Sequence, residues 1–289
     1  MSAKFHFHKL TNQRGFSHVE LLIAITVIGL IAFVGVHVLT QSHAYTGHRV
    51  LWGESFGGSS VTNIKTATSA WSNATVGRYY FSGDPKTYST SSLTSIPSNE
   101  TIFVSFKTSV ASVASGSYNA TFATILKSWN NSGRTIYWTW QHEPDDPTKN
   151  IAPAQFVAGF NQLLSVERAN PSPNVKSMSI LMAYALAKGQ PHGNPDSWYV
   201  NTDVLGFDCY QLKTELLAEA YATSKGKALA FPEVGDGIKA GQTDFQANAF
   251  AHSFNSALTP NVFAAVWYNA GVNKLAPWPN TLNYLKTLP

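Results

Sequence analysis

Two glutamates of this chain each end an apolar run and stand directly before a polar loop. Glu143 lies in the stretch "TWQHEP", where His142 precedes it and Pro144 follows it. Glu233 lies in the stretch "ALAFPEVGDG". A glutamate at the end of a strand is usually a solvated loop residue. Two glutamates at the same edge of one sheet, however, could act as a catalytic pair. One would be the general acid and the other the nucleophile or general base.

The elements that must position these glutamates are recurring apolar runs of the kind that form strands. Several are near-continuous in Val, Ile, Phe and Tyr, which is typical of parallel strands buried on both faces. The eight runs cover residues 49–56, 77–83, 101–107, 135–143, 178–186, 204–210, 228–235 and 262–269.

Segments with helical spacing lie between the later runs, so the pattern favours an α/β fold. We expect helices at residues 116–129, 152–169, 215–226 and 244–258. Eight strands with crossovers predict a (β/α)8 TIM barrel over residues 48–289, preceded by an N-terminal transmembrane helix. The alternative is a doubly wound open sheet. That fold normally carries a glycine-rich phosphate loop after strand one, and "WGESFGGSS" lacks both common forms of it.

In a barrel, the C-terminal ends of the strands form the catalytic face. Glu143 ends run four and Glu233 ends run seven, so both glutamates fall on that face. The motifs "WTWQHEP" and "FPEVG" at these two strands resemble those of the clan A retaining glycoside hydrolases. Most members of that clan place Asn before the first glutamate. His142 in that position is similar to the family 26 endo-mannanase and β-glucanase group.

The resemblance implies that Glu143 is the acid/base and Glu233 the nucleophile of a glycosidase. One carboxylic acid protonates the leaving oxygen while one carboxylate attacks the anomeric carbon, and the pair stands roughly 5–5.5 Å apart. We expect apolar, aromatic surroundings and the second carboxylate to raise the pKa of Glu143. Glu233 would stay ionised with the help of hydrogen-bond donors.

Other residues are candidates for substrate binding by their position. His142 could bind substrate or orient the site, and Tyr210, at the end of run six, stands where the clan often has a tyrosine contacting the nucleophile. Trp267 in run eight could stack under a sugar ring. Trp140 shares one strand face with Trp138, and that face is either the barrel interior or its outside. Weaker candidates are Lys107, Asp208 and Trp198, and for Asp208 we favour a structural role as a hydrogen-bond acceptor.

Other chemistries find little support in the sequence. The zincin motif needs a second histidine four residues after the first on a helix, whereas position 146 is Asp and two prolines flank it; we predict no catalytic metal and no cofactor. A G-x-S-x-G elbow is absent. The single cysteine, Cys209, lies in an apolar run and is expected to be a small packed residue. The net charge of +4 comes without a Lys/Arg block, so we predict no nucleic-acid partner.

The first forty residues differ from the rest. Residues 21–39 are apolar apart from Thr26 and His37, a length that nearly crosses a hydrocarbon core. The preceding leader is basic, so the positive-inside rule predicts a cytoplasmic N-terminus. Gly15, Phe16 and Glu20 have the spacing of a type IV prepilin or pseudopilin leader, which this segment resembles. That family is cleaved after the glycine. The alternative is a plain membrane anchor.

Together these features predict a leader at residues 1–15, a transmembrane helix and linker at 16–47 and the barrel at 48–289. The hypothesis is an exported, single-pass membrane protein whose barrel lies on the extracytoplasmic side and cleaves a β-linked polysaccharide of β-mannan or β-glucan type. Pilus or secretion-system subunits would be its further partners. The alternatives are a carbohydrate-binding barrel without catalysis and a structural pseudopilin subunit.

Overall fold

The computed structural model describes residues 50–55, 71, 74–187, 194–235, 243–268 and 278–288. The predicted leader and transmembrane helix, with Gly15, Phe16 and Glu20, lie outside these residues. Within the described ranges, none of the helices has the length and apolar character needed to cross a membrane.

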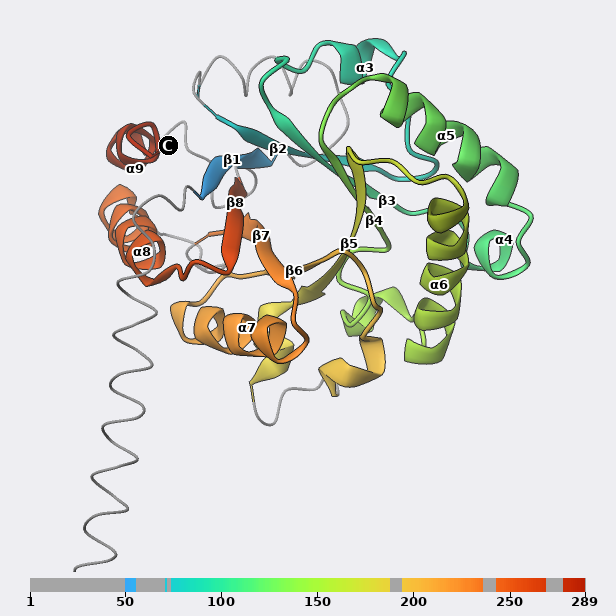
Figure 1. Ribbon diagram of the computed structural model, residues 1–289. Helices are drawn as coiled ribbons and strands as arrows, with labels where there is room; N and C mark the ends of the chain where they lie inside the picture. The colour runs from blue at the N-terminus through green and yellow to red at the C-terminus, as the bar shows by residue number, and fades with distance from the viewer. Residues whose placement is uncertain are drawn as a thin grey trace, which may run out of the picture. The chain divides into compact units, whose positions relative to one another are not determined.

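Eight parallel strands form a closed barrel in chain order, in which β8 pairs with β1 to complete the ring (Figure 1). The strands are β1 (Leu51–Ser55), β2 (Val76–Phe81), β3 (Thr101–Phe106), β4 (Ile136–Trp140), β5 (Val175–Met182), β6 (Val204–Asp208), β7 (Ala228–Val234) and β8 (Val262–Tyr268). Each of the eight predicted runs overlaps one strand, so the barrel prediction is confirmed. The open sheet is excluded because an open sheet has two unpaired edges.

Helices surround the barrel (Figure 1). They are α3 (Ser91–Thr94), α4 (Val110–Ala114), α5 (Asn119–Asn131), α6 (Pro153–Ala169), α7 (Leu212–Ser224), α8 (Asp244–Ala257) and α9 (Pro279–Leu285). The four predicted helices are confirmed, with shifts of up to three residues at their ends. The described part of the β5–β6 connection contains only the short 3-10 helices η2 (Ala183–Leu186) and η3 (Pro195–Trp198).

Local sequence explains where these helices begin and end. Pro153 opens α6, where its missing N–H costs nothing. Thr243 caps α8 by accepting from the backbone N–H of Gln246, whose side chain bonds back to the backbone N–H of Thr243. Gly226 follows α7 with a φ of +64°, a left-handed conformation that glycine adopts without a steric penalty. The helix predicted over residues 215–226 therefore ends just before this glycine.

Side chains alternate between the inside of the barrel and the layer beneath the helices. The inner core is small and made of Val76, Phe103, Met178, Ile180, Val204, Ala230, Ala264 and Val266. The outer core is larger, rich in aromatic rings, and packs the strands against the helices. Above the inner core, toward the C-terminal ends of the strands, polar residues replace apolar ones on the inner face, and this change of composition places the candidate site.

Helix α7 buries two carboxyl groups while it exposes leucines. Glu215 and Glu219 are 1% and 5% exposed, whereas Leu216 is 59% exposed. Glu219 accepts a hydrogen bond of 3.0 Å from the backbone N–H of Thr259. Burial, together with the hydrogen bond and the negative charge of Glu219, raises the pKa of Glu215 to about 9. Near neutral pH Glu215 therefore keeps its proton and can donate it toward Glu219.

This pair predicts a pH-dependent stability. Because the folded-state pKa of Glu215 lies above its unfolded value of 4.5, folding takes up a proton and stability falls as the pH rises from about 4.5 to about 9. The Glu215→Gln variant keeps a donor toward Glu219 without an ionisable group. We expect it to gain about 2 kcal/mol at pH 8, or about 4–8 °C in Tm, and to gain nothing at pH 4. Thermal unfolding followed by circular dichroism at both pH values measures this, and an equal gain at pH 4 would contradict it.

Candidate active site

Glu233 reaches the barrel interior through an irregularity in β7. Phe231 pairs with Ala265 and Val234 pairs with Trp267, so β7 places two residues where β8 places one. Phe231 and Val234 both remain in the outer core. The extra residue breaks the strict alternation of sides, as a β-bulge does, and lets the Glu233 side chain turn inward.

Three polar groups hold the Glu233 carboxylate. The Tyr80 hydroxyl donates to Oε1 and the Tyr210 hydroxyl donates to Oε2. Arg78 Nη1 lies 3.2 Å from Oε1 and 2.7 Å from Oδ1 of Asp208. Burial raises the pKa of both tyrosines well above the usual value, so both remain protonated donors. Both oxygens of Glu233 are thus fixed, and its charge faces a guanidinium.

The Arg78 side chain is fully buried inside the barrel. Its Nε donates to Ser105 Oγ at 3.1 Å, and its guanidinium lies 4.7 Å from the centre of the Tyr80 ring. Burial alone disfavours the cation, but the attraction of Asp208 and Glu233 outweighs it, so the pKa of Arg78 is raised. The positive charge among these carboxylates is therefore permanent. The favoured role of Asp208, a structural acceptor, agrees with this ion pair.

Glu143 is held by a turn that follows β4 rather than by the strand itself. Gln141 and Glu143 have φ values of +53° and +50°, which cost non-glycine residues of order 1 kcal/mol or more each. The backbone N–H of Gln141 donates to Phe106 on β3, and that of Glu143 donates to Ile180 on β5, at 2.9 and 2.8 Å. These bonds to the two neighbouring strands hold the strained turn and aim Glu143 across the barrel mouth.

The two predicted carboxylates meet there. One oxygen each from Glu143, Asp208 and Glu233 lie within 4.8 Å of one another. Burial and the negative charge of Glu233 raise the pKa of Glu143, while Lys149, whose Nζ is 3.1 Å from Oε2, opposes the rise. The raised pKa that the sequence led us to expect is confirmed in direction, and the second carboxylate is one of its causes. Three carboxylates at this spacing can also coordinate a cation, but the Arg78 guanidinium already supplies a positive charge to two of them.

His142 lies at the same mouth, 9% exposed, with its ring 5.4 Å from that of Tyr80. Burial, with Arg78, Lys149 and Lys107 nearby, lowers the pKa of His142 well below its usual value, so the imidazole is neutral. Its Nδ1 is buried and has no hydrogen-bond partner among the described residues. The neutral ring can therefore exchange a hydrogen bond with a bound ligand.

The structure brings four of the predicted site residues together: Glu143, Glu233, His142 and Tyr210. Lys107 is close enough that Lys149 and Glu143 both act on its charge. Trp198 packs instead against Phe156 of α6 in the outer core.

The predicted roles of Trp140 and Trp267 in substrate binding are wrong. Both side chains are fully buried outside the barrel. Trp140 stacks on Phe156 and touches α6 so closely that a Cβ at Gly159 would lie 2.5 Å from its ring. Trp267 packs edge-on against Phe250 of α8. Val266, which precedes Trp267, belongs to the inner core, so Trp267 in the alternate register faces the helices. Trp140 alternates with Thr139 in the same way on β4.

Sequence reasoning missed three residues of the site: Arg78, Tyr80 and Lys149. The sequence could have indicated Arg78 and Tyr80. A charged residue within an apolar strand, such as Arg78, must be paired, and Tyr80 lies two residues later on the same strand face. Lys149 had no such signal, since it lies nine residues after β4 ends, in a loop. Its contact with Glu143 depends on how that loop folds back.

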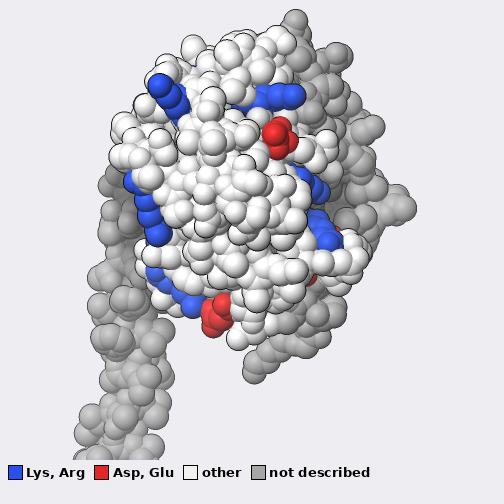
Figure 2. All heavy atoms as spheres, turned by 90° about the vertical axis from the view of Figure 1, so that its right-hand side faces the viewer, with Lys and Arg blue, Asp and Glu red and all other residues white. Residues whose placement is uncertain are grey.

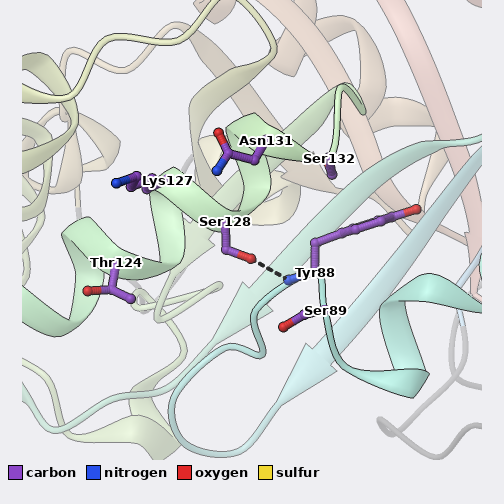
Figure 3. A pocket seen from close by; sticks show the side chains of 7 residues that line it. All are labelled: Tyr88, Ser89, Thr124, Lys127, Ser128, Asn131 and Ser132. Atoms are coloured by element: carbon purple, nitrogen blue, oxygen red, sulfur yellow. Dashed lines mark hydrogen bonds between the residues drawn. The ribbon is translucent and has the colours of Figure 1, made fainter.

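A concavity lies on the flank of the barrel, between α5 and the segment that follows β2 (Figure 3). Its volume is about 400 Å³, and hydroxyl and amide side chains line most of it, with Tyr88 and Lys127. The Tyr88 backbone N–H donates to Ser128 Oγ at 3.0 Å. No carboxylate lines this groove, so it offers no pair of groups for general acid and general base catalysis. The mouth of the barrel remains the candidate active site.

Solved structures with a similar fold are glycoside hydrolases. The GH26-CBM35 β-(1,4)-mannanase of Podospora anserina matches with a TM-score of 0.52 at 10% identity, over 82% of this chain and 60% of that one. Cel5A of Thermotoga maritima, a mutant form in complex with cellobiose, matches with 0.56 at 10% identity, over 82% and 95%. A GH30 endoxylanase of Clostridium papyrosolvens matches with 0.51 at 15% identity, over 83% and 71%.

At identities of 10–15% this likeness is one of fold, and it supports the (β/α)8 barrel. The chain spans about 60% of the length of the mannanase. No protein-family profile matches the chain, and no curated protein matches it in sequence.

Proposed function

We propose that the barrel is a retaining glycoside hydrolase that cleaves a β-linked polysaccharide of β-mannan or β-glucan type. The observation that carries the proposal is the approach of Glu143 and Glu233 to within 4.8 Å, oxygen to oxygen, at the barrel mouth. Retaining enzymes hold their carboxyl groups about 5–5.5 Å apart, whereas inverting enzymes need about 6.5–9.5 Å to admit a water molecule.

The two glutamates have the environments that the two roles require. Glu143, with its raised pKa, holds a proton and gives it to the glycosidic oxygen as the bond to the anomeric carbon breaks. Glu233, fixed by Tyr80 and Tyr210, attacks that carbon and forms a covalent glycosyl ester. Water then replaces Glu233 at the carbon and gives its proton to Glu143. Both residues return to their starting states.

The substrate class rests on the similar structures together with the site. A β-(1,4)-mannanase and Cel5A in complex with cellobiose share the fold, and the substrates of both are β-linked. His142 and Tyr210 would contact the sugar next to the scissile bond, since both lie at the mouth beside the carboxylates. Polar groups with fixed positions, rather than the buried tryptophans, would therefore set the orientation of the sugar.

The first test of this proposal is hydrolysis of soluble β-mannan and mixed-linkage β-glucan with product stereochemistry followed by proton NMR. A retaining enzyme releases the β-anomer first, and mutarotation follows. Release of the α-anomer first would contradict the nucleophilic role of Glu233. Polymer that is bound but left uncut would favour the carbohydrate-binding barrel, and neither binding nor cleavage would favour the structural pseudopilin.

Replacing Glu143 by glutamine gives a second test. We expect the variant to cut polysaccharide about a hundredfold more slowly or worse, because proton transfer contributes about 10²–10⁴-fold. A dinitrophenyl β-glycoside needs no proton on its leaving group, so its first step should be far less affected. Equal losses on both substrates would contradict the acid role, and circular dichroism of the variant controls for folding.

Export and tethering remain proposals that rest on the sequence of residues 14–39 alone. The protein would span the cell membrane once, with the barrel on the extracytoplasmic side, and pilus or secretion-system subunits would be its neighbours. Sequencing the N-terminus of the mature protein tests the leader: Phe16 as the first residue supports prepilin-type processing, and Met1 supports a simple anchor.

A further inference from the structure

Lys149 lies in the loop that follows Glu143, the candidate acid, and its ammonium group contacts that residue. It ends the 3-10 helix η1 (Pro147–Lys149), and its Nζ donates to the backbone carbonyl of His142 at 2.8 Å and to Glu143 Oε2 at 3.1 Å. Asp146 stiffens the segment between them, since its backbone N–H bonds the Glu143 carbonyl and its side chain accepts from Thr148. The ammonium is therefore held against Glu143 by a closed, hydrogen-bonded loop.

Glu143 stands in a mixed field of charges. The groups that act on Glu143 or respond to its charge come from several elements around the mouth. They are Arg78 from β2, Lys107 after β3, Asp145 and Lys149 after β4, Tyr184 after β5, Asp208 from β6, Glu233 from β7 and Tyr268 from β8. Lys149 is the cation in direct contact with it. In the described residues Arg78 instead makes its ion pairs with Asp208 and Glu233.

A cation in contact with a general acid is a disadvantage in the first half of the reaction. The acid must hold a proton, and an adjacent ammonium favours its release. In the free enzyme the negative charge of Glu233 and the burial of Glu143 offset this effect. Once Glu233 has become a neutral glycosyl ester, its charge is gone while that of Lys149 remains. The protonation equilibrium of Glu143 then favours the ionised carboxylate.

We propose that Lys149 is a positioning residue that keeps Glu143 ionised in the glycosyl-enzyme, so that Glu143 serves as the base of the second half-reaction. This inference rests on the proposed function. In that step the water oxygen forms a bond to the anomeric carbon, and the bond from that carbon to Glu233 breaks with its electron pair returning to the carboxylate. The proton of the water passes to Glu143. Without Lys149, the buried Glu143 would take a proton from solvent before the water could use it.

The test compares Lys149→Met with Lys149→Arg on a dinitrophenyl β-glycoside of the sugar that the wild type cleaves. This leaving group makes the second step limiting. With Lys149→Met we expect kcat to fall about tenfold, the effect of about one pKa unit at Glu143, and KM to fall in parallel. The ratio kcat/KM should change less than about threefold, because it reports the first step. The acidic limb of the kcat profile should move up by about one pH unit.

Three further measurements keep a structural effect apart from the proposed one. Lys149→Arg keeps the cation and should restore most of kcat and the position of the acidic limb. Lys127→Met makes the same change on the flank of the barrel and should leave all three parameters unchanged. Mass spectrometry of enzyme quenched during turnover should find more glycosyl-enzyme in Lys149→Met than in the wild type.

Several outcomes would overturn the inference. Loss of kcat/KM together with kcat would mean that Lys149 matters for the first step or for folding. An arginine variant as slow as the methionine variant would exclude the charge, and an unmoved pH profile would exclude a role in ionisation. Each of these leaves the proposed function standing if the wild type cleaves the substrate. A wild type without hydrolytic activity overturns both.

Discussion

Glutamine at position 233 is expected to lower kcat by about a thousandfold or more, which corresponds to about 4 kcal/mol of activation free energy. The amide has the shape of the carboxylate and can still bond Tyr80 and Tyr210, but it cannot form the glycosyl ester. Stability should change little because the side-chain volume is kept. Hydrolysis of the polymer and of an aryl glycoside should be lost together, since both need the nucleophile.

Glu100→Gln is the matched control for this substitution. Glu100 is also buried, at 5% exposed, and also accepts from a tyrosine, with Tyr79 donating at 2.8 Å. It lies outside the barrel interior, however, so its replacement should leave hydrolysis intact. A Glu233→Gly variant supplied with azide gives a second measurement. Azide entering from the vacated side should yield the α-glycosyl azide, and a β-product or an active Glu233→Gln variant would contradict the assignment.

The Arg78→Met variant is expected to lose about 3–5 kcal/mol of stability, or about 10 °C or more in Tm. The substitution leaves Asp208, whose side chain is fully buried, without its partner at 2.7 Å, and it also removes the cation beside Glu233. Breaking one side of a buried ion pair is costly because the other charge stays out of water. Denaturant unfolding monitored by tryptophan fluorescence measures the loss.

The double variant Arg78→Met/Asp208→Asn separates stability from activity. Neutralising Asp208 removes the unpaired charge, so we expect much of the stability to return, while hydrolysis stays low because Glu233 still lacks its cation. Arg168→Met, an exposed arginine, should cost less than about 1 kcal/mol. Additive losses in the double variant would contradict the coupling between Arg78 and Asp208.

Charged side chains are sparse on the face of the molecule shown in Figure 2, in line with the 12% of charged residues in the sequence. On the face shown in Figure 2, basic side chains are scattered among uncharged ones and do not gather into one patch. A ligand with many hydroxyl groups and no charge suits such a surface better than a phosphate backbone does. The composition therefore agrees with the proposed substrate class.

The positions of the strands could be predicted because each strand is a short apolar run. A parallel strand that is buried on both faces needs apolar residues at almost every position, and local sequence shows this directly. The placement of Glu143 and Glu233 on one face followed from the barrel rule alone, since strands four and seven must end at the same side. Short motifs sufficed for this inference because it depended on strand order and not on side-chain direction.

Side-chain direction was harder to predict. The alternation of Trp138 and Trp140 with Thr139 shows that the tryptophans share a face, but a period of two does not tell which face is inside. Trp267 raised the same question. The bulge in β7 that turns Glu233 inward follows from pairing with β8, where Phe231 pairs with Ala265 and Val234 pairs with Trp267, residues far apart along the chain. Local sequence does not predict how β7 and β8 align.

The sequence by itself thus determined the barrel, its eight strands and the two glutamates at its mouth, because these depend on hydrophobic runs and on the order of elements. The tertiary structure alone decided that Arg78 joins Asp208 to Glu233, that Lys149 folds back onto Glu143, and that the tryptophans face the helices. Those contacts join residues from separate strands and loops, and their energies depend on distance and burial. These distances and this burial are set only when the eight strands close into the barrel.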